Sequence, residues 1–412
     1  MPIELSPVGV KCNLNCPYCY EIPMRDAGNM SVPFDLDRVM ESLDDKNMEF
    51  ILFGGEPLLL PIEYVEKLWK HGYEKYGKNG MQTNGTLFTD EHYELIKKYK
   101  VHPGISLDGP PELNDTRWAG NFKLTREKSE KTMEAIKRLC EQGTPPSIIV
   151  TLHKKNATEE LLPILKDWFL ELEAMGVYGS RLHTLEVEYD SVGESLALSP
   201  ERNAQVLLEM AEFESNVLTT LKFDIFEDVK KMMGLVDNQT TCVWNACDPY
   251  TTRAVQGMDG QGVMTNCGRS NKEGINFKKS DQEGFERYLA LYHTPEEHLG
   301  CKDCRFWLMC KGQCPGTSEK TDWRNRSDLC GTWKYLFNHF EQEFEKEGRV
   351  PLSKSPIRKK IEERFIEYWQ MGQNPHIFDV YHEVNDELSF GSSSILRNNS
   401  QHGDYTRRDE TL

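Results

Sequence analysis

Eleven of the twelve cysteines lie at short spacing from one another, and the first group is Cys12, Cys16 and Cys19. The N-terminus has no signal-peptide pattern, so clustered cysteines indicate metal or iron–sulfur ligands here and not disulfides. Three thiolates on one loop can hold three irons of a cubane cluster and leave the fourth iron open. Zinc is the alternative, but a structural zinc site takes four ligands, usually from paired C-x2-C units.

A second group of cysteines occupies the C-terminal half of the chain. Its members are Cys242, Cys247, Cys267, Cys301, Cys304, Cys310, Cys314 and Cys330. Eight thiolates divide into two sets of four, which suits two cubane clusters with no open iron. A zinc ribbon needs only C-x2-C pairs and explains neither the x5 nor the x3 spacing between Cys304, Cys310 and Cys314. Cys140 is left over, on the apolar face of an expected helix, and we interpret it as a buried small hydrophobic residue.

Polar turns follow three of the expected strands. They are Gly54-Gly55-Glu56-Pro57, Thr83-Asn84-Gly85 and Ser106-Leu107-Asp108-Gly109. Glycines let the backbone approach a ligand closely, and a carboxylate can pair with an ammonium group. Taken singly, each turn is explained as well by local capping. Weaker candidates are His153, Asn156, His183 and Glu186.

Six short apolar runs alternate with amphipathic helical patterns in the first half of the chain. The runs are Ile3 to Val10, Met48 to Phe53, Gly80 to Thr83, Val101 to Leu107, Ser147 to Leu152 and Tyr178 to Val187. This alternation predicts an α/β fold, a partial (β/α)6 TIM-like barrel with reactive groups at the carboxyl ends of the strands. A doubly wound sheet is less favoured, because no G-x-G-x-x-G follows the first strand.

The composition predicts three segments. Residues 1–235 form the barrel, and residues 236–348, rich in Cys, Gly and Trp, form a small domain whose core depends on metal. Residues 349–412 form a C-terminal extension, helical from about Ser355 to Met371. We expect it to be disordered from Phe390.

The first cysteine group resembles that of the radical S-adenosylmethionine (SAM) enzymes, whose loop reads C-x3-C-x-aromatic-C with Tyr18 at the aromatic position. The resemblance implies that the open iron binds SAM. It also implies that Gly54, Gly55 and Glu56 meet the methionine amino group of SAM. Residues that similar enzymes use for the remaining cofactor contacts correspond to Thr83, Asn84, Ser106 and Asp108.

The second group resembles, spacing by spacing, the cysteine-rich iron–sulfur SPASM domain of peptide- and protein-modifying radical SAM enzymes. It implies three [4Fe–4S] clusters in all. Cys242, Cys247, Cys267 and Cys314 would hold the inner auxiliary cluster. Cys301, Cys304, Cys310 and Cys330 would hold the outer one. The spacing alone does not fix this interleaving.

The function implied by the resemblance is oxidation of a ribosomally synthesised precursor peptide through a 5′-deoxyadenosyl radical. The auxiliary clusters would accept the electron left on the substrate, giving a crosslink or excision of a backbone or residue fragment. The alternatives are an anaerobic sulfatase-maturating (formylglycine-generating) enzyme and a non-catalytic cysteine-rich metal-binding protein. Sulfatase-maturating enzymes have an Asp after the third cysteine of this domain, where this chain has Gly268. No residue of the sequence is assigned as the general base.

Composition limits the partners and the compartment. Lys and Arg number 49 against 66 Asp and Glu, a net charge of −17, which argues against unaided binding to nucleic acid or anionic lipid. No apolar run is long enough for a membrane helix, so we predict a cytoplasmic enzyme with no membrane and no nucleic-acid partner. We expect a precursor peptide as substrate and a flavodoxin- or ferredoxin-type electron donor. A separate small leader-recognition protein is a further candidate partner, because few residues precede Cys12.

Overall fold

A nine-stranded sheet forms the centre of the computed structural model, which describes residues 2–252, 254–277, 280 and 282–401. The strand order is β7-β6-β5-β4-β3-β2-β1-β8-β9, and every neighbouring pair is parallel except β8 and β9. The strands are β1 (Ile3–Ser6), β2 (Phe50–Leu52), β3 (Asn79–Thr83), β4 (Val101–Ser106), β5 (Ser147–Leu152), β6 (Gly179–Thr184), β7 (Lys222–Phe223), β8 (Gly257–Asp259) and β9 (Met264–Thr265). The predicted α/β fold class with a partial barrel is confirmed.

The six predicted strands, β1 to β6, are neighbours in chain order. Successive residues of a strand face opposite sides of the sheet. In β1, Ile3 and Leu5 are inaccessible to solvent, whereas Glu4 and Ser6 on the other face are partly exposed. Alternation with a period of two places the apolar set against the helices and leaves the concave face more polar. This face is where a bound molecule can be held.

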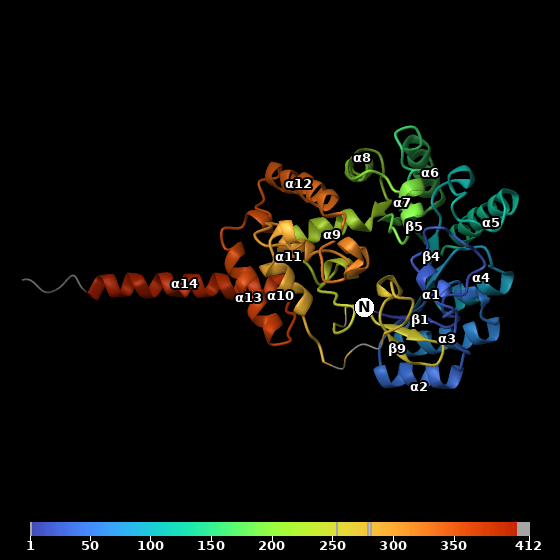
Figure 1. The fold of residues 1–412 in the computed structure, drawn as a ribbon, viewed down its shortest axis with the longest axis horizontal. Helices are drawn as coiled ribbons and strands as arrows, with labels where there is room; N and C mark the ends of the chain where they lie inside the picture. The colour runs from blue at the N-terminus through green and yellow to red at the C-terminus, as the bar shows by residue number, and fades with distance from the viewer. Residues whose placement is uncertain (1, 253, 278–279, 281, 402–412) are drawn as a thin grey trace, which may run out of the picture.

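Helices cover the apolar face of the sheet (Figure 1). Those of the barrel are α1 (Ile22–Asp26), α2 (Leu36–Lys46), α3 (Ile62–Tyr76), α4 (Asp90–Lys98), α5 (Phe122–Glu141) and α6 (Leu162–Met175). Their ends carry the expected caps: Asn121 accepts a hydrogen bond from Leu124 N at the start of α5, and Gly77 and Gly176 end α3 and α6 with positive φ.

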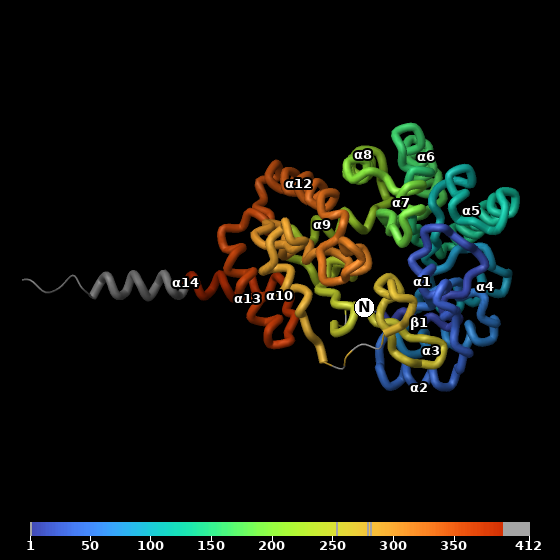
Figure 2. Tube along the Cα trace, viewed as in Figure 1, coloured from blue at the N-terminus to red at the C-terminus, as the bar shows by residue number. Residues whose placement is uncertain are grey.

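The C-terminal half lies beside the barrel, with α9 between the two in Figure 2. Three helices of the first half, α7 (Asp190–Leu196), α8 (Pro200–Asn216) and α9 (Asp224–Met233), lead to it. The helices of the C-terminal half are α10 (Glu286–His293), α11 (Trp307–Cys310), α12 (Cys330–Lys346), α13 (Arg358–Gln370) and α14 (Ile377–Gln401). Helix α12 packs on α8 and α9, so the hydrophobic core runs from one half into the other. The predicted boundaries at residues 235 and 348 stay predictions.

Helices α13 and α14 lie in the predicted C-terminal extension, whose bounds and whose expected disorder from Phe390 stay predictions. Helix α14 continues to Gln401 and leads away from the rest of the molecule (Figure 1). The buried side chains of Ile377, Val380 and Val384 anchor the first turns of α14. Once these turns have formed, each further residue adds a backbone hydrogen bond without a new nucleation cost. Residues 402–412 lie outside the described residues. No helix among the described residues has the length and apolarity to cross a membrane.

Candidate functional site

The loop between β1 and α1 carries Cys12, Cys16 and Cys19 at the carboxyl end of the sheet. The loop residues Leu14, Cys16 and Tyr18 pack on an apolar patch of Leu185, Val192 and Leu196, which follows β6. Burial raises the pKa of the Cys16 thiol to about 11 and that of Cys19 to about 12. Such thiols are protonated at neutral pH, so they become thiolates only when a metal centre binds them.

Three N–H groups point at the sulfur atoms of this loop. Arg25 Nη2 donates to Cys19 Sγ at 3.6 Å, and Asn84 Nδ2 donates to Cys12 Sγ at 3.6 Å. The backbone N of Leu14 also donates to Cys12 Sγ, at 3.4 Å. Hydrogen bonds of this kind favour anionic sulfur. The donor set therefore fits an iron–sulfur cluster held by three thiolates.

The predicted turn after β2 packs directly on the cysteine loop. Gly55 has a φ of 44°, and a Cβ at this position would lie 2.0 Å from the backbone oxygen of Lys11, so only glycine fits. The buried carboxylate of Glu56 accepts hydrogen bonds from Thr83 Oγ1 at 2.7 Å and from the backbone N of Asn84 at 2.8 Å. The structure thus brings Gly55, Glu56, Thr83 and Asn84 together beside Cys12.

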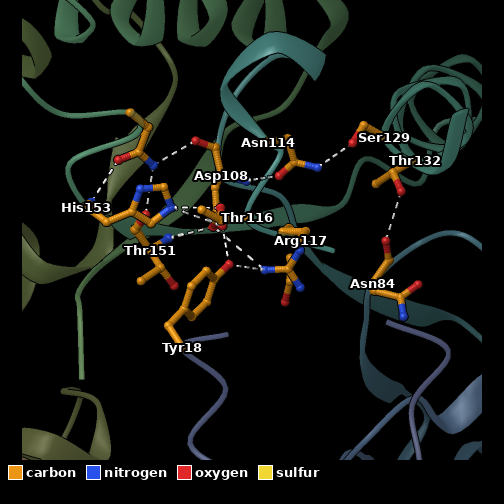
Figure 3. A network of polar contacts seen from close by, with 12 residues as sticks. Tyr18, Asn84, Asp108, Asn114, Thr116, Arg117, Ser129, Thr132, Thr151 and His153 are labelled. Atoms are coloured by element: carbon orange, nitrogen blue, oxygen red, sulfur yellow. Dashed lines mark hydrogen bonds and ion pairs between the residues drawn. The ribbon is translucent and has the colours of Figure 1, made fainter. Parts of the chain in front are cut away.

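A buried polar network lies on the other side of the cysteine loop (Figure 3). Tyr18 donates its hydroxyl hydrogen to Asp108 Oδ2 and accepts a hydrogen bond from Arg117 Nη1 at 3.1 Å. Asp108 Oδ1 accepts from the backbone N of Thr151 at 3.0 Å, and His153 Nε2 lies 3.6 Å from Asp108 Oδ2. Burial would raise the pKa of Asp108, but the charge of Arg117 and these hydrogen bonds lower it, so the carboxylate stays ionised.

Two of the weaker sequence candidates, His153 and Asn156, belong to this network, and two others, His183 and Glu186, do not. Asn156 Nδ2 donates to the backbone oxygens of Asp108 and Thr151, both at 2.8 Å. Ser106 lies on β4, and its hydroxyl accepts a hydrogen bond from Gln82 Nε2 at 2.8 Å. The remaining candidates, His183 and Glu186, lie toward the C-terminal half.

A cluster of four charged side chains joins the segment after β6 to the segment after Cys267. Glu186 pairs with Arg269 and, at 3.7 Å, with Lys272, which also pairs with Glu188. Burial lowers the pKa of His183, and the charges of Arg269 and Arg181 lower it further. The sequence analysis missed Arg269, Lys272 and Glu188, because no local pattern indicates a partner about 80 residues away.

Glu21 is another residue that the sequence did not indicate. A Cβ on Gly268 would lie 3.8 Å from Glu21 Oε1 and 3.1 Å from the ring of Tyr20. Burial raises the pKa of Glu21 to about 7, against the lowering effects of the Arg25 charge and the Gly55 N–H. A buried carboxylate thus lies beside Gly268, although residue 268 itself has none.

Six of the eight C-terminal cysteines line two cavities. Those of one group, Cys301, Cys304, Cys310 and Cys330, line a cavity of about 20 Å³, which we call the outer cavity. Cys242 and Cys314 line another of about 60 Å³, the inner cavity. Burial raises the pKa of Cys242 to about 12, and the neighbouring Cys247 and Cys314 raise it as well; Cys242 and Cys314 do the same for Cys267. Cys140 is half-buried on α5, apart from both groups.

Among the residues that the structure describes, no three His, Cys, Asp or Glu side chains converge as ligands of a single metal ion. Ligands of a cubane cluster stand further apart, because each binds a different iron. The outer cavity therefore fits the donor set of a cubane cluster in residue type and number. The inner cavity has two cysteines in its lining, and Cys247 and Cys267 lie close enough to interact with them.

Comparison with known proteins gives matches over most of the chain. The model of the Radical SAM superfamily matches residues 6–167. A serine-type anaerobic sulfatase-maturating enzyme of Bacteroides thetaiotaomicron is 25% identical over 353 residues, 76% of this chain and 82% of that protein. An uncharacterised protein of Archaeoglobus fulgidus is 38% identical over 342 residues, 79% of this chain and 77% of that protein.

Solved structures share the fold. Native anSMEcpe with bound AdoMet superposes with a TM-score of 0.63 at 19% identity, covering 84% of this chain and 98% of that one. Streptococcus suis SuiB bound to the precursor peptide SuiA superposes with a TM-score of 0.50 at 15% identity, covering 80% and 76%. The arrangement of a partial barrel followed by a cysteine-rich module is thus one already seen in solved structures.

Proposed function

The chain belongs to the radical SAM superfamily, and from this membership we propose that it oxidatively modifies a ribosomally synthesised precursor peptide, by crosslink formation or by excision of a fragment. Membership implies an enzyme that uses SAM and a [4Fe–4S] cluster. The observation that carries the finer proposal is the pair of four-cysteine groups behind the barrel, with a SuiB-like fold as further support.

We assign the first cluster to Cys12, Cys16 and Cys19, with Arg25 and Asn84 as hydrogen-bond donors to its sulfur ligands. When bound, this cluster and SAM supply a carbon radical able to remove hydrogen from an unactivated C–H bond. The residues proposed to contact SAM are Tyr18, Gly54, Gly55, Glu56, Thr83, Asn84, Ser106 and Asp108. In support, five of these take part in buried hydrogen bonds in or beside the cysteine loop: Tyr18, Glu56, Thr83, Asn84 and Asp108.

The protein's own contribution is to hold these residues in place and to exclude water. Glu56 fixes the turn at Asn84, and Asp108 fixes Tyr18 against β4 and β5. The apolar patch of Leu185, Val192 and Leu196 covers the cysteine loop. A dry site of fixed geometry keeps a reactive radical from side reactions and holds the target hydrogen in place.

We further propose two auxiliary [4Fe–4S] clusters, an inner one on Cys242, Cys247, Cys267 and Cys314 and an outer one on Cys301, Cys304, Cys310 and Cys330. They would accept the electron left on the substrate, which makes the net reaction an oxidation. A flavodoxin- or ferredoxin-type protein would supply the electron that starts each turnover.

A second candidate function, formylglycine formation on a sulfatase, is favoured by two observations. The Bacteroides relative with that name matches 76% of the chain. Glu21 places a carboxylate beside Gly268, so a proton acceptor near this position comes from another part of the chain.

Mass spectrometry of co-expressed substrates tests both functions. With a precursor peptide we expect a loss of two hydrogens for a crosslink, or a larger loss for excision. A sulfatase peptide should remain unchanged. Formylglycine formation at a rate similar to that of a dedicated enzyme, with no change in any precursor peptide, would overturn the first proposal in favour of the second.

A further inference from the structure

Six buried N–H groups line the two cysteine cavities and have no acceptor in the part of the chain that the structure describes. Trp307 Nε1 and Arg326 Nε line the outer cavity. Trp244 Nε1, Arg269 Nε and Gln313 Nε2 line the inner cavity. Trp333 Nε1 belongs to a residue that lines both.

Buried donors without an acceptor are rare in folded proteins, because each loses its hydrogen bonds to water and gains none in return. Other such donors exist in the described chain, for example Trp69 Nε1 on α3, but Trp69 lines neither cavity. By contrast, the indole N–H of Trp168 donates to Met133 Sδ and that of Trp369 to Asn374. A concentration of six at the cysteines indicates that an acceptor belongs there.

The remaining contacts of these side chains fix where the free N–H groups point. Gln313 Oε1 accepts a hydrogen bond from the backbone N of Cys314 at 3.1 Å, which leaves its amide Nε2 as the free end. Arg326 Nη1 donates to the backbone oxygen of Gly300 at 3.0 Å. Arg269 pairs with Glu186 through Nη2, so its Nε–H group is not used by this ion pair. None of these groups can turn to another partner without breaking a bond that it already makes.

Trp333 has a special position among the six. It lies on α12, three residues after Cys330, and packs edge to face against Trp244 with ring centroids 5.6 Å apart. Because it lines both cavities, the Trp333 side chain lies at the boundary between the two cysteine groups, and its indole N–H is buried without an acceptor among the described residues.

We propose that these N–H groups donate hydrogen bonds to the sulfur atoms of the two auxiliary clusters, and that Trp333 acts on both. The inference rests on the proposed function, since it requires the auxiliary clusters. Reduction adds negative charge to a cluster, and an N–H donor stabilises that charge. The donors therefore raise the reduction potentials and make both clusters better electron acceptors. Tryptophans that served packing alone would not influence these potentials.

Redox titration followed by electron paramagnetic resonance tests the inference. In a protein with Cys12, Cys16 and Cys19 changed to Ala, only the auxiliary clusters remain, and Trp333→Phe keeps an aromatic ring while removing the N–H. We expect both midpoint potentials to become more negative. Trp307→Phe should shift one of them and Trp244→Phe the other. Trp69→Phe, the matched control, should shift neither.

A second measurement needs no substitution at the tryptophans. With tryptophan labelled by ¹⁵N at the indole, electron–nuclear double resonance on the reduced auxiliary clusters should detect a ¹⁵N coupling. Unchanged potentials in Trp333→Phe, or no ¹⁵N coupling, in a protein with about eight irons per chain would overturn the inference alone. A triple-alanine protein with little iron would overturn the auxiliary clusters and, with them, the inference.

Discussion

Glu56 shows how a residue beside the cysteine loop acts through its neighbours. Its carboxylate accepts hydrogen bonds from Leu58 N, Thr83 Oγ1 and Asn84 N, and Asn84 in turn donates to Cys12 and Asn13. One buried side chain therefore joins the ends of β2 and β3 to the cysteine loop. The position of Asn84 depends on Glu56 as much as on its own strand.

Glu56→Ala should weaken SAM binding by about five- to 150-fold, because the buried donors on Thr83 and Asn84 lose the acceptor that holds their turn in place, at a cost of about 1–3 kcal/mol. Iron content should stay near that of the wild type, since Glu56 contacts no cysteine sulfur. Equilibrium dialysis with SAM and an iron assay measure the two effects. Glu63→Ala, at an exposed position in the first turn of α3, is the control. Loss of the cluster in Glu56→Ala would show that its main role is to hold the loop.

The cysteines differ in what their removal should do. With three clusters the protein should contain about twelve irons per chain. Cys16→Ala should lose about a third of that iron, whereas Cys140→Ala should keep all of it, because Cys140 packs apart from the other eleven. An iron and zinc assay after anaerobic reconstitution measures both. Stoichiometric zinc with little iron would contradict the cluster assignment.

At the scale of elements, the sequence predicted the six strands that alternate with helices and missed the three short strands β7, β8 and β9. Strands β1 to β6 were predicted because six short apolar runs alternate with amphipathic helical patterns in this part of the chain. β7, β8 and β9 have two or three residues each, too few for a period to be visible. β8 pairs with β1, from more than 250 residues away, and only the folded chain shows this pairing.

The carboxylate of Glu173 on α6 holds the turn that leads into β7. It accepts hydrogen bonds from the backbone N atoms of Thr219, Thr220 and Leu221 at 2.9, 2.6 and 2.8 Å. Desolvation raises the pKa of Glu173, but these three donors outweigh it and lower the pKa to about 2. The stabilisation is therefore present at neutral pH and is lost as the pH falls from about 4.5 toward 2.

Glu173→Gln should destabilise the protein by about 1 kcal/mol at pH 7, a value reduced for solvent screening at this partly exposed site. Thermal unfolding at pH 7 and at pH 4 measures the change, and the difference from wild type should shrink at the lower pH. Glu171→Gln, exposed on the same helix, should have no effect at either pH. An equal destabilisation at both pH values would mean that the charge of Glu173 is not what matters.

At the scale of the molecule, the candidate site is built from contacts that cross long stretches of sequence. The cysteine spacings predict eleven cluster ligands, because ligand spacing is a local pattern. Arg117 contacts Tyr18 from 99 residues away, and Glu21 faces Gly268 from the other half of the chain. No local pattern predicts such contacts, so the sequence analysis missed both Arg117 and Glu21.

The two halves also share structure outside the site. β8 covers the edge of β1, α12 packs on α8 and α9, and Phe226 on α9 contacts Phe340 on α12 with ring centroids 5.9 Å apart. An unpaired edge strand and an exposed apolar helix face both favour aggregation. The barrel sequence therefore depends on the C-terminal half for stability.

A chain that ends at residue 235 should for this reason fail to fold as a stable unit, although it contains seven strands of the sheet and all three cysteines of the first group. Each large apolar side chain that it exposes costs about 1.5–3 kcal/mol, and a few of them exceed the total stability of about 5–15 kcal/mol of an ordinary domain. We expect aggregation, no cooperative thermal transition and no bound cluster after reconstitution. A chain that ends at Gly372 is the control, because it loses only α14 and the residues around it and keeps the β1–β8 pairing, so it should stay folded and retain its iron. A soluble 1–235 fragment with a cooperative melting transition and about four irons would show instead that the barrel folds without its C-terminal half.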